Sequence, residues 1–263
     1  MNSSFFRGIG ARLARHLSKP ARHPVRGPTN PPEKFRSALK KGDVILVEGA
    51  SRFSIAIKNL TQSTCSHAAL YIGDAVDSFD QGEEARVIVE ADIKDGIRLM
   101  PLSLFYERHT RICRPVGLSS NEIDQIVDYA VSREGDQYDL KNIFDLARYL
   151  IQRPPVPDHW RRRLLAIGSG DPTRAICSSL VARAFHSVGY PILPFFSEEE
   201  SKDSSLRGAI EEYARIRHHS LFAPGDFDLS PYFDTVKPTV EYGFEPKQFN
   251  WKDPDSVLAD AAG

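Results

Sequence analysis

The sequence predicts an α+β fold in which helices pack against an antiparallel sheet. Short apolar segments of strand length follow one another over residues 43–114 with short connections, which is typical of antiparallel strands. Segments with helical spacing come mainly afterwards, over residues 119–188. Strand and helix do not alternate regularly along the chain, as they would in a parallel α/β fold.

The strand signal is clearest over Arg86–Asp92, where apolar and polar residues alternate as in a half-buried strand. This alternation places Glu90 on the same face as Ile88 and opposite Val89. Other segments with strand-like composition are Asp43–Glu48, His67–Gly73, Gly96–Leu102 and His109–Arg114. We expect a helix over residues 51–60, between the first two strands.

The later helices have recognisable start and stop signals. Ser119 and Glu122 form the S-x-x-E capping pattern ahead of residues with helical spacing. A second helix is expected over Leu140–Ile151, before two prolines. A third lies within Thr173–Val188, and Gly189 is suited to end it.

Length alone allows one large domain or two small ones, and we expect a single folded domain over residues 35–250. The chain has 263 residues, of which 41% are hydrophobic, so a sizeable core is possible and global disorder is excluded. We expect residues 1–34 to be a basic, Pro-rich segment and linker, and residues 251–263 to be a tail. From Phe222 onward the chain is expected to wrap the surface as ordered loops. The acidic run at residues 198–200 is expected in a solvated loop.

The N-terminal segment is strongly basic. Residues 1–30 contain six Lys and Arg residues and no acid, whereas the whole chain has a net charge of −1. Phe5, Ile9, Leu13 and Leu17 recur every four residues. The segment therefore fits either an amphipathic helix on an anionic membrane surface or a solvated, disordered tail. The remainder is acidic, so no nucleic-acid partner is expected.

Cysteine usage and the N-terminus indicate the compartment. The chain has three cysteines, and such a small, odd number does not indicate a disulfide framework. Arginines at positions 7, 12 and 15 interrupt the apolar stretch that a secretory signal peptide requires. We expect a cytoplasmic protein, with a peripheral membrane contact if residues 1–30 bind lipid.

Three residues could together carry nucleophilic catalysis. Cys177 stands near the start of an expected helix, where free amides and the helix dipole favour a thiolate. His67 could hold the proton, and Glu90 could orient the imidazole. Each residue alone also fits a structural explanation, as a buried core cysteine, a hydrogen-bonded histidine and a surface carboxylate.

Metal and cofactor sites are not expected. Cys65 and His67 could ligate zinc with Cys113 or Cys177, but the C-x-H spacing is not that of usual zinc motifs. The sequence has no P-loop, G-x-G-x-x-G or EF-hand motif.

Four segments occur in an order that resembles a known family: KKGDVILVEG, SHAALYIGD, VIVEADIKDGIRLMPL and ICSSLVARAF. They are similar to the permuted papain-like hydrolases of the NlpC-type superfamily, in the YiiX/YaeF/YebB branch. The resemblance spans about residues 39–190, and DFDLSPYFDTVKP also resembles the C-terminal part of some members. It implies a circularly permuted papain-like fold, with the nucleophile at a helix N-terminus.

The resemblance also implies roles for individual residues. Cys177 matches the nucleophile, His67 the base and Glu90 the third polar residue of this branch. The related lecithin:retinol acyltransferase group uses a second histidine as third residue, but no histidine lies between His67 and His109. Tyr138 matches a family Gly-x-x-Tyr segment and is expected to line the substrate cleft. Asp43 matches the aspartate of a Gly-Asp pair in the family and is expected to have a structural role.

These roles imply a thiol-dependent amidase or peptidase that acts on a peptide or acyl-amide substrate through an acyl-thioester. Two alternatives stay open. One is a lipid-directed acyltransferase or deacylase with the same thioester chemistry, and the other is a catalytically silent binding module.

Overall fold

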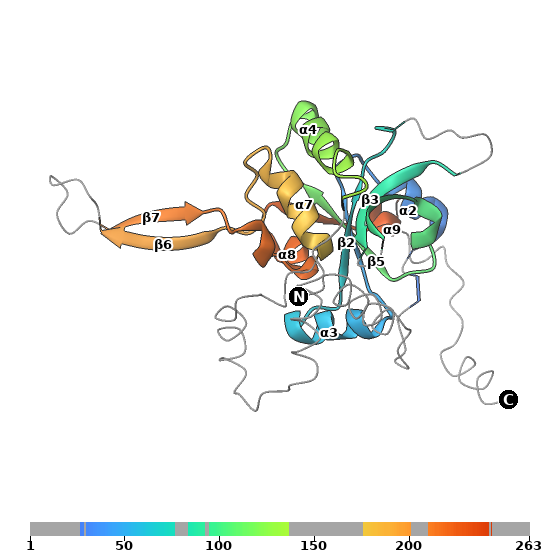
Figure 1. The fold of residues 1–263 in the computed structure, drawn as a ribbon, viewed down its shortest axis with the longest axis horizontal. Helices are drawn as coiled ribbons and strands as arrows, with labels where there is room; N and C mark the ends of the chain where they lie inside the picture. The colour runs from blue at the N-terminus through green and yellow to red at the C-terminus, as the bar shows by residue number, and fades with distance from the viewer. Residues whose placement is uncertain are drawn as a thin grey trace, which may run out of the picture.

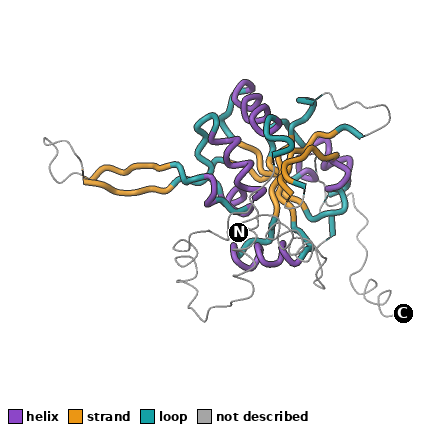
Figure 2. The backbone as a smooth tube through the Cα atoms, in the orientation of Figure 1, coloured by secondary structure: helices purple, strands orange, loops and turns teal. Residues whose placement is uncertain are grey.

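The protein is built around a six-stranded antiparallel sheet with the strand order β4-β3-β2-β1-β5-β8 (Figure 1). The computed structural model describes residues 27–28, 30–76, 84–92, 95–136, 176–200, 210–241 and 243. Helices cover both faces of the sheet, as Figure 2 shows. The expected α+β class is therefore confirmed.

The strands of the sheet are β1 (Val44–Val47), β2 (His67–Tyr71), β3 (Arg86–Asp92), β4 (Gly96–Pro101), β5 (Thr110–Pro115) and β8 (Phe233–Val236). The first five confirm the expected strand segments, and each boundary lies within two residues of the expected one. All neighbouring strands pair antiparallel. The two strands nearest the functional residues, β2 and β3, lie inside the sheet rather than at its edge.

Side-chain alternation divides the core between the two faces of the sheet. One buried cluster includes Leu46, Leu70 and Val89 and is covered by α4 (Ser120–Val131), α7 (Ile176–His186) and α8 (Pro224–Leu229). The other includes Ile45, Ala69 and Ile88 and is covered by α2 (Pro32–Ala38) and the 3-10 helix η1 (Leu102–Phe105). The short helix α9 (Pro238–Glu241) contacts α2. Glu90 shares the face of Ile88, as its register predicts.

Local capping explains two of the helices. Helix α3 (Arg52–Thr61) begins after Ser51, whose hydroxyl accepts a hydrogen bond from the Ser54 amide at 3.0 Å. It lies below the sheet in Figure 1, near the ends of the strands that it connects. Helix α4 has the expected capping box between Ser119 and Glu122.

The C-terminal region differs from the expected surface loops. Residues after Phe222 form α8 and α9 and add strand β8 beside β5. The cause is aromatic burial, because Phe222, Phe227 and Phe233 are each at most 6% exposed. These side chains contribute to the core beneath α7, so the segment is part of the main fold.

The acidic run at residues 198–200 is also not in a loop. It belongs to β6 (Phe195–Glu200), which pairs antiparallel with β7 (Ile210–Arg215). This hairpin projects away from the sheet (Figures 1 and 2). The 3-10 helix η3 (His219–Leu221) follows it and packs on α7.

Several expectations fall on residues outside the described ones: the helix at Leu140–Ile151, the whole of residues 1–26 and the tail at 251–263. At the beginning of the fold, α2 starts at Pro32, because proline suits the first turn of a helix. Within the described ranges, every helix is too short or too polar to cross a bilayer.

Candidate active site

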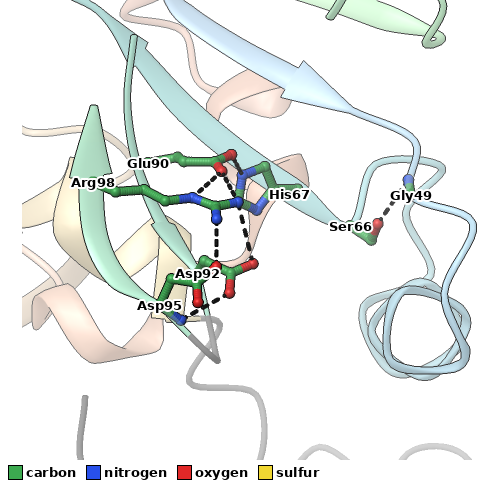
Figure 3. Close-up of polar contacts among 7 residues, drawn as sticks. All are labelled: Gly49, Ser66, His67, Glu90, Asp92, Asp95 and Arg98. Atoms are coloured by element: carbon green, nitrogen blue, oxygen red, sulfur yellow. Dashed lines mark hydrogen bonds and ion pairs between the residues drawn. The ribbon is translucent and has the colours of Figure 1, made fainter. Parts of the chain in front are cut away.

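Two of the proposed residues meet on neighbouring strands. Glu90 on β3 pairs with Ala69 on β2, and His67 lies two residues before Ala69 on the same face. His67 is therefore the diagonal neighbour of Glu90, within reach of a long side chain. Nε2 of His67 lies 2.8 Å from Oε2 of Glu90 (Figure 3).

Cys177 comes to this pair from a helix. It is the second residue of α7, and only 5% of it is exposed. Its sulfur shares a hydrogen bond with the His67 imidazole. Because Nε2 of His67 faces Glu90, Nδ1 is the ring nitrogen left for Cys177. The structure thus brings the side chains of Cys177, His67 and Glu90 close together.

Backbone amides also point at the cysteine sulfur. The amides of Ala68 and Ser178 both donate to it. The β2–β3 ladder ends at the pair of Ala69 and Glu90, so the Ala68 amide lies just beyond the last paired residues. The end of the ladder therefore leaves a strand amide for the sulfur, while the first turn of α7 supplies a helix amide.

Helix α7 is fixed in place next to the cysteine. The hydroxyl of Ser178 donates to the carbonyl of Phe222 at 2.7 Å, and both residues are fully buried. The same helix packs against β2 and β3. Because the contact is one residue from Cys177, it ties the position of the sulfur to the C-terminal region.

The electrostatics of the site favour an imidazolium. Burial alone would lower the pKa of His67, but the charges and hydrogen bonds of Cys177 and Glu90 outweigh it and raise the pKa to about 10. For Glu90, burial alone would raise the pKa, but contacts with His67 and Arg98 lower it to about 2. Glu90 is therefore ionised at neutral pH.

The three cysteines differ in the direction in which their surroundings shift the thiol pKa. Burial would raise the pKa of Cys177, but the His67 charge and the hydrogen bonds from His67 and the two amides lower it below the ordinary value. Burial raises the pKa of Cys65 and of Cys113. Arg111 opposes burial at Cys65 and Cys113 without overcoming it, so Cys177 is the one cysteine of the three whose surroundings support a thiolate.

Sequence reasoning missed Arg98. This residue on β4 is the cross-strand partner of Glu90, and its Nε and Nη2 donate to Oε1 of Glu90 at 3.0 and 2.7 Å (Figure 3). A signal was present, because Arg98 interrupts the apolar run GIRLMPL. The antiparallel register of β3 and β4 places positions 90 and 98 opposite each other.

Other sequence candidates have different outcomes. Tyr138 lies outside the described residues. The segment before it runs along the edge of β4, where the Gly135 amide donates to the Ile97 carbonyl at 2.9 Å. Asp43 is fully buried, and Arg114 binds it at 2.8 and 2.9 Å, which fits the expected structural role.

In the described part of the chain, no three His, Cys, Asp or Glu side chains gather as a metal ion would require. The chemistry available at the site is that of a thiol, an imidazole and a carboxylate. These groups can form and break an acyl bond to sulfur.

Comparison with known proteins agrees with the resemblance found in the sequence. Residues 38–149 match the family described as permuted papain-like amidase enzyme, YaeF/YiiX, C92 family. His67, Glu90 and Arg98 lie inside the matched range, whereas Cys177 lies beyond it. The match confirms the expectation of a papain-like amidase-type enzyme.

Among solved structures, the chain is similar to metalloprotein yiiX from Escherichia coli O157:H7, with 15% sequence identity and a TM-score of 0.43. The similarity covers 75% of this chain and 96% of that one. No curated protein matches the chain.

Proposed function

We propose, from the match of residues 38–149 to the family of permuted papain-like amidases, that this chain hydrolyses amide bonds with a Cys177-His67-Glu90 triad. The observation that carries the proposal is the contact of the Cys177 sulfur with His67, whose other ring nitrogen faces Glu90. The α7 helix then supplies the nucleophile at its N-terminal turn, as in a circularly permuted papain-like fold.

The reaction begins with the Cys177 thiolate. The sulfur attacks the carbonyl carbon of the substrate and forms a tetrahedral intermediate. When the bond between this carbon and the amide nitrogen breaks, the His67 imidazolium donates its proton to the departing amine. The acyl group is then held on sulfur as a thioester.

Hydrolysis reverses the proton transfers. Neutral His67 removes a proton from water, which attacks the thioester carbon. The carbon–sulfur bond breaks, the carboxylic acid leaves, and Cys177 again shares a proton with His67. Throughout, Glu90 accepts the Nε2–H hydrogen bond and stabilises the charge on the imidazole.

The oxyanion of the tetrahedral intermediate requires donors near Cys177. The backbone amide of Cys177 belongs to the first turn of α7, where amides have no partner within the helix. We assign it to the oxyanion hole, where such a donor stabilises the developing negative charge.

Peptides or acyl-amides are the proposed substrates, because the family description names an amidase. This description favours amide hydrolysis over acyl transfer to lipid or a silent binding role. Tyr138 stays a proposal for the substrate cleft.

Trapping the thioester tests this function. We expect p-nitrophenyl acetate to acetylate Cys177, and we expect hydroxylamine to remove the acetyl group, as it removes thioesters. The Cys177→Ala variant is the matched control because it retains Cys65 and Cys113. A hydroxylamine-labile acetyl group on Cys177 in peptide maps supports the proposal. Its absence, or an equal burst of p-nitrophenol from Cys177→Ala, contradicts it.

A further inference from the structure

Arg98 holds one oxygen of Glu90 in a side-on contact. Nε and Nη2 of the guanidinium both donate to Oε1, at 3.0 and 2.7 Å. The other oxygen, Oε2, faces Nε2 of His67 at 2.8 Å (Figure 3). The two oxygens of Glu90 thus have separate partners on the two strands that flank β3.

Arg98 is itself fixed from its other side. Its Nη1 donates to a carboxylate oxygen of Asp95 at 2.5 Å, and its Nη2 lies 3.6 Å from a carboxylate oxygen of Asp92. The Asp95 amide in turn donates to the Asp92 side chain at 3.1 Å. Asp92 and Asp95 therefore orient the guanidinium toward Glu90 (Figure 3).

This arrangement matters because Glu90 is buried, with 8% of its side chain exposed. A buried carboxylate with one partner can take up a proton or turn toward solvent. Two charge-assisted hydrogen bonds to Oε1 oppose both changes. The charged groups around Glu90 are His67 on β2, Arg98 on β4, Asp92 and Asp95 of the hairpin, and the Cys177 sulfur on α7.

We propose that Arg98 is a positioning residue, which keeps Glu90 charged and holds its second oxygen against His67. The inference rests on the proposed function of Cys177, His67 and Glu90. Arg98 then acts on the reaction only through Glu90, and its loss leaves the carboxylate free to protonate at a higher pH.

The chain offers a matched control in Arg114. This arginine on β5 binds the buried Asp43 through the same two nitrogens, with Nε donating to one carboxylate oxygen at 2.9 Å and Nη2 to the other at 2.8 Å. Neither Asp43 nor Arg114 belongs to the site. The variant Arg114→Gln therefore removes an equivalent arginine–carboxylate contact and should affect stability without changing Glu90.

The first measurement is the titration of Glu90 by NMR, with carbon-13 in glutamate carboxyl groups. The Glu90 signal is identified by its absence from Glu90→Gln. In the wild type we expect Glu90 to stay ionised down to at least about pH 4, since its pKa is lowered to about 2. In Arg98→Gln the pKa should rise by about one to three units. Arg98→Lys, which keeps a charge without the fork, should lie between them.

The second measurement is a double-variant cycle on Cys177 acetylation by p-nitrophenyl acetate. In the wild-type background, Arg98→Gln should slow acetylation by about tenfold or more, the scale of a lost orienting contact. In the Glu90→Gln background, the same change should alter the rate by less than about twofold, because the residue through which Arg98 acts is gone.

The outcomes separate this inference from the proposed function. If Glu90 titrates alike in the wild type and Arg98→Gln, or shifts equally in Arg114→Gln, the inference is overturned. It is also overturned if the rate losses in the cycle multiply independently. If wild-type Cys177 is never acetylated, the proposed function fails, even when the titration shows that Arg98 holds Glu90 charged.

Discussion

Nε2 of His67 lies 2.8 Å from Oε2 of Glu90, and the other oxygen of this carboxylate is occupied by Arg98. The ring of His67 therefore has one fixed partner on the sheet side, and its second nitrogen is turned to Cys177. This division of contacts explains why a histidine at the head of a strand can serve a cysteine on a separate helix.

Replacing Glu90 with Gln should reduce activity and preserve the fold. The lowered pKa of Glu90, about 2 against 4.5, means that its ionised form stabilises the folded protein fully above about pH 4.5. This contribution is lost as the pH falls toward 2. In urea unfolding above pH 4.5, the free energy of unfolding of Glu90→Gln should thus be lower than that of the wild type by at most about 3 kcal/mol. This difference should shrink at lower pH. An unfolded variant at neutral pH would instead mark Glu90 as essential to the fold.

Removing the thiol should change the titration of His67. The pKa of His67 is raised to about 10, partly by the charge and hydrogen bond of Cys177. In Cys177→Ala burial is opposed by Glu90 alone, so this pKa should fall. Nitrogen-15 NMR of the imidazole measures it directly, with a His67→Gln sample to identify the signals. An unchanged titration would mean that Cys177 and His67 do not interact.

The buried hydrogen bond from Ser178 to the Phe222 carbonyl should help to hold Cys177 in position. In Ser178→Ala the Phe222 carbonyl loses a donor, which should lower the free energy of unfolding by about 1–3 kcal/mol and slow acetylation of Cys177. The control is Ser187→Ala, directly after the end of α7, where the hydroxyl donates to the nearby Ala184 carbonyl. Equal effects of the two variants on acetylation would exclude a positioning role for Ser178.

The basic N-terminal segment, residues 1–30, is predicted either to bind anionic membranes or to remain a solvated tail. Its six basic residues should attract it to anionic membranes, each by about 1 kcal/mol at low salt. Co-sedimentation with phosphatidylserine vesicles should therefore occur for the full chain, weaken in high salt, and be lost on deletion of residues 1–30. Thiol-dependent activity should survive the deletion. If the full chain stays in the supernatant at low salt, the segment is a solvated tail.

The sequence predicted the sheet well where apolar alternation was strong. Strand Arg86–Asp92 and the face of Glu90 followed from period-two patterning alone. The same patterning could not show that residues 222–236 join the core, because aromatic side chains in a Pro- and Asp-rich stretch give no clear period. Their burial depends on α7, a distant partner in the sequence.

The candidate site could be predicted only in part, because some of its contacts also depend on how separate segments pair. Cys177 and His67 have local signals, a helix start and a strand start. Arg98 has none that identifies its partner, since its role depends on the register of β3 and β4. The amide of Ala68 could not be foreseen either, because its availability depends on where a ladder between two strands ends.

In the proposed mechanism, His67 makes Cys177, alone among the three cysteines, a thiolate in the folded protein. The most direct test is the rate of iodoacetamide labelling of each cysteine at pH 6, resolved by peptide mapping. We expect Cys177 to be labelled far faster than Cys65 and Cys113, whose pKa values are raised by burial. We also expect this advantage to disappear in His67→Gln. Equal, slow labelling of all three cysteines in the wild type would show that His67 does not activate Cys177.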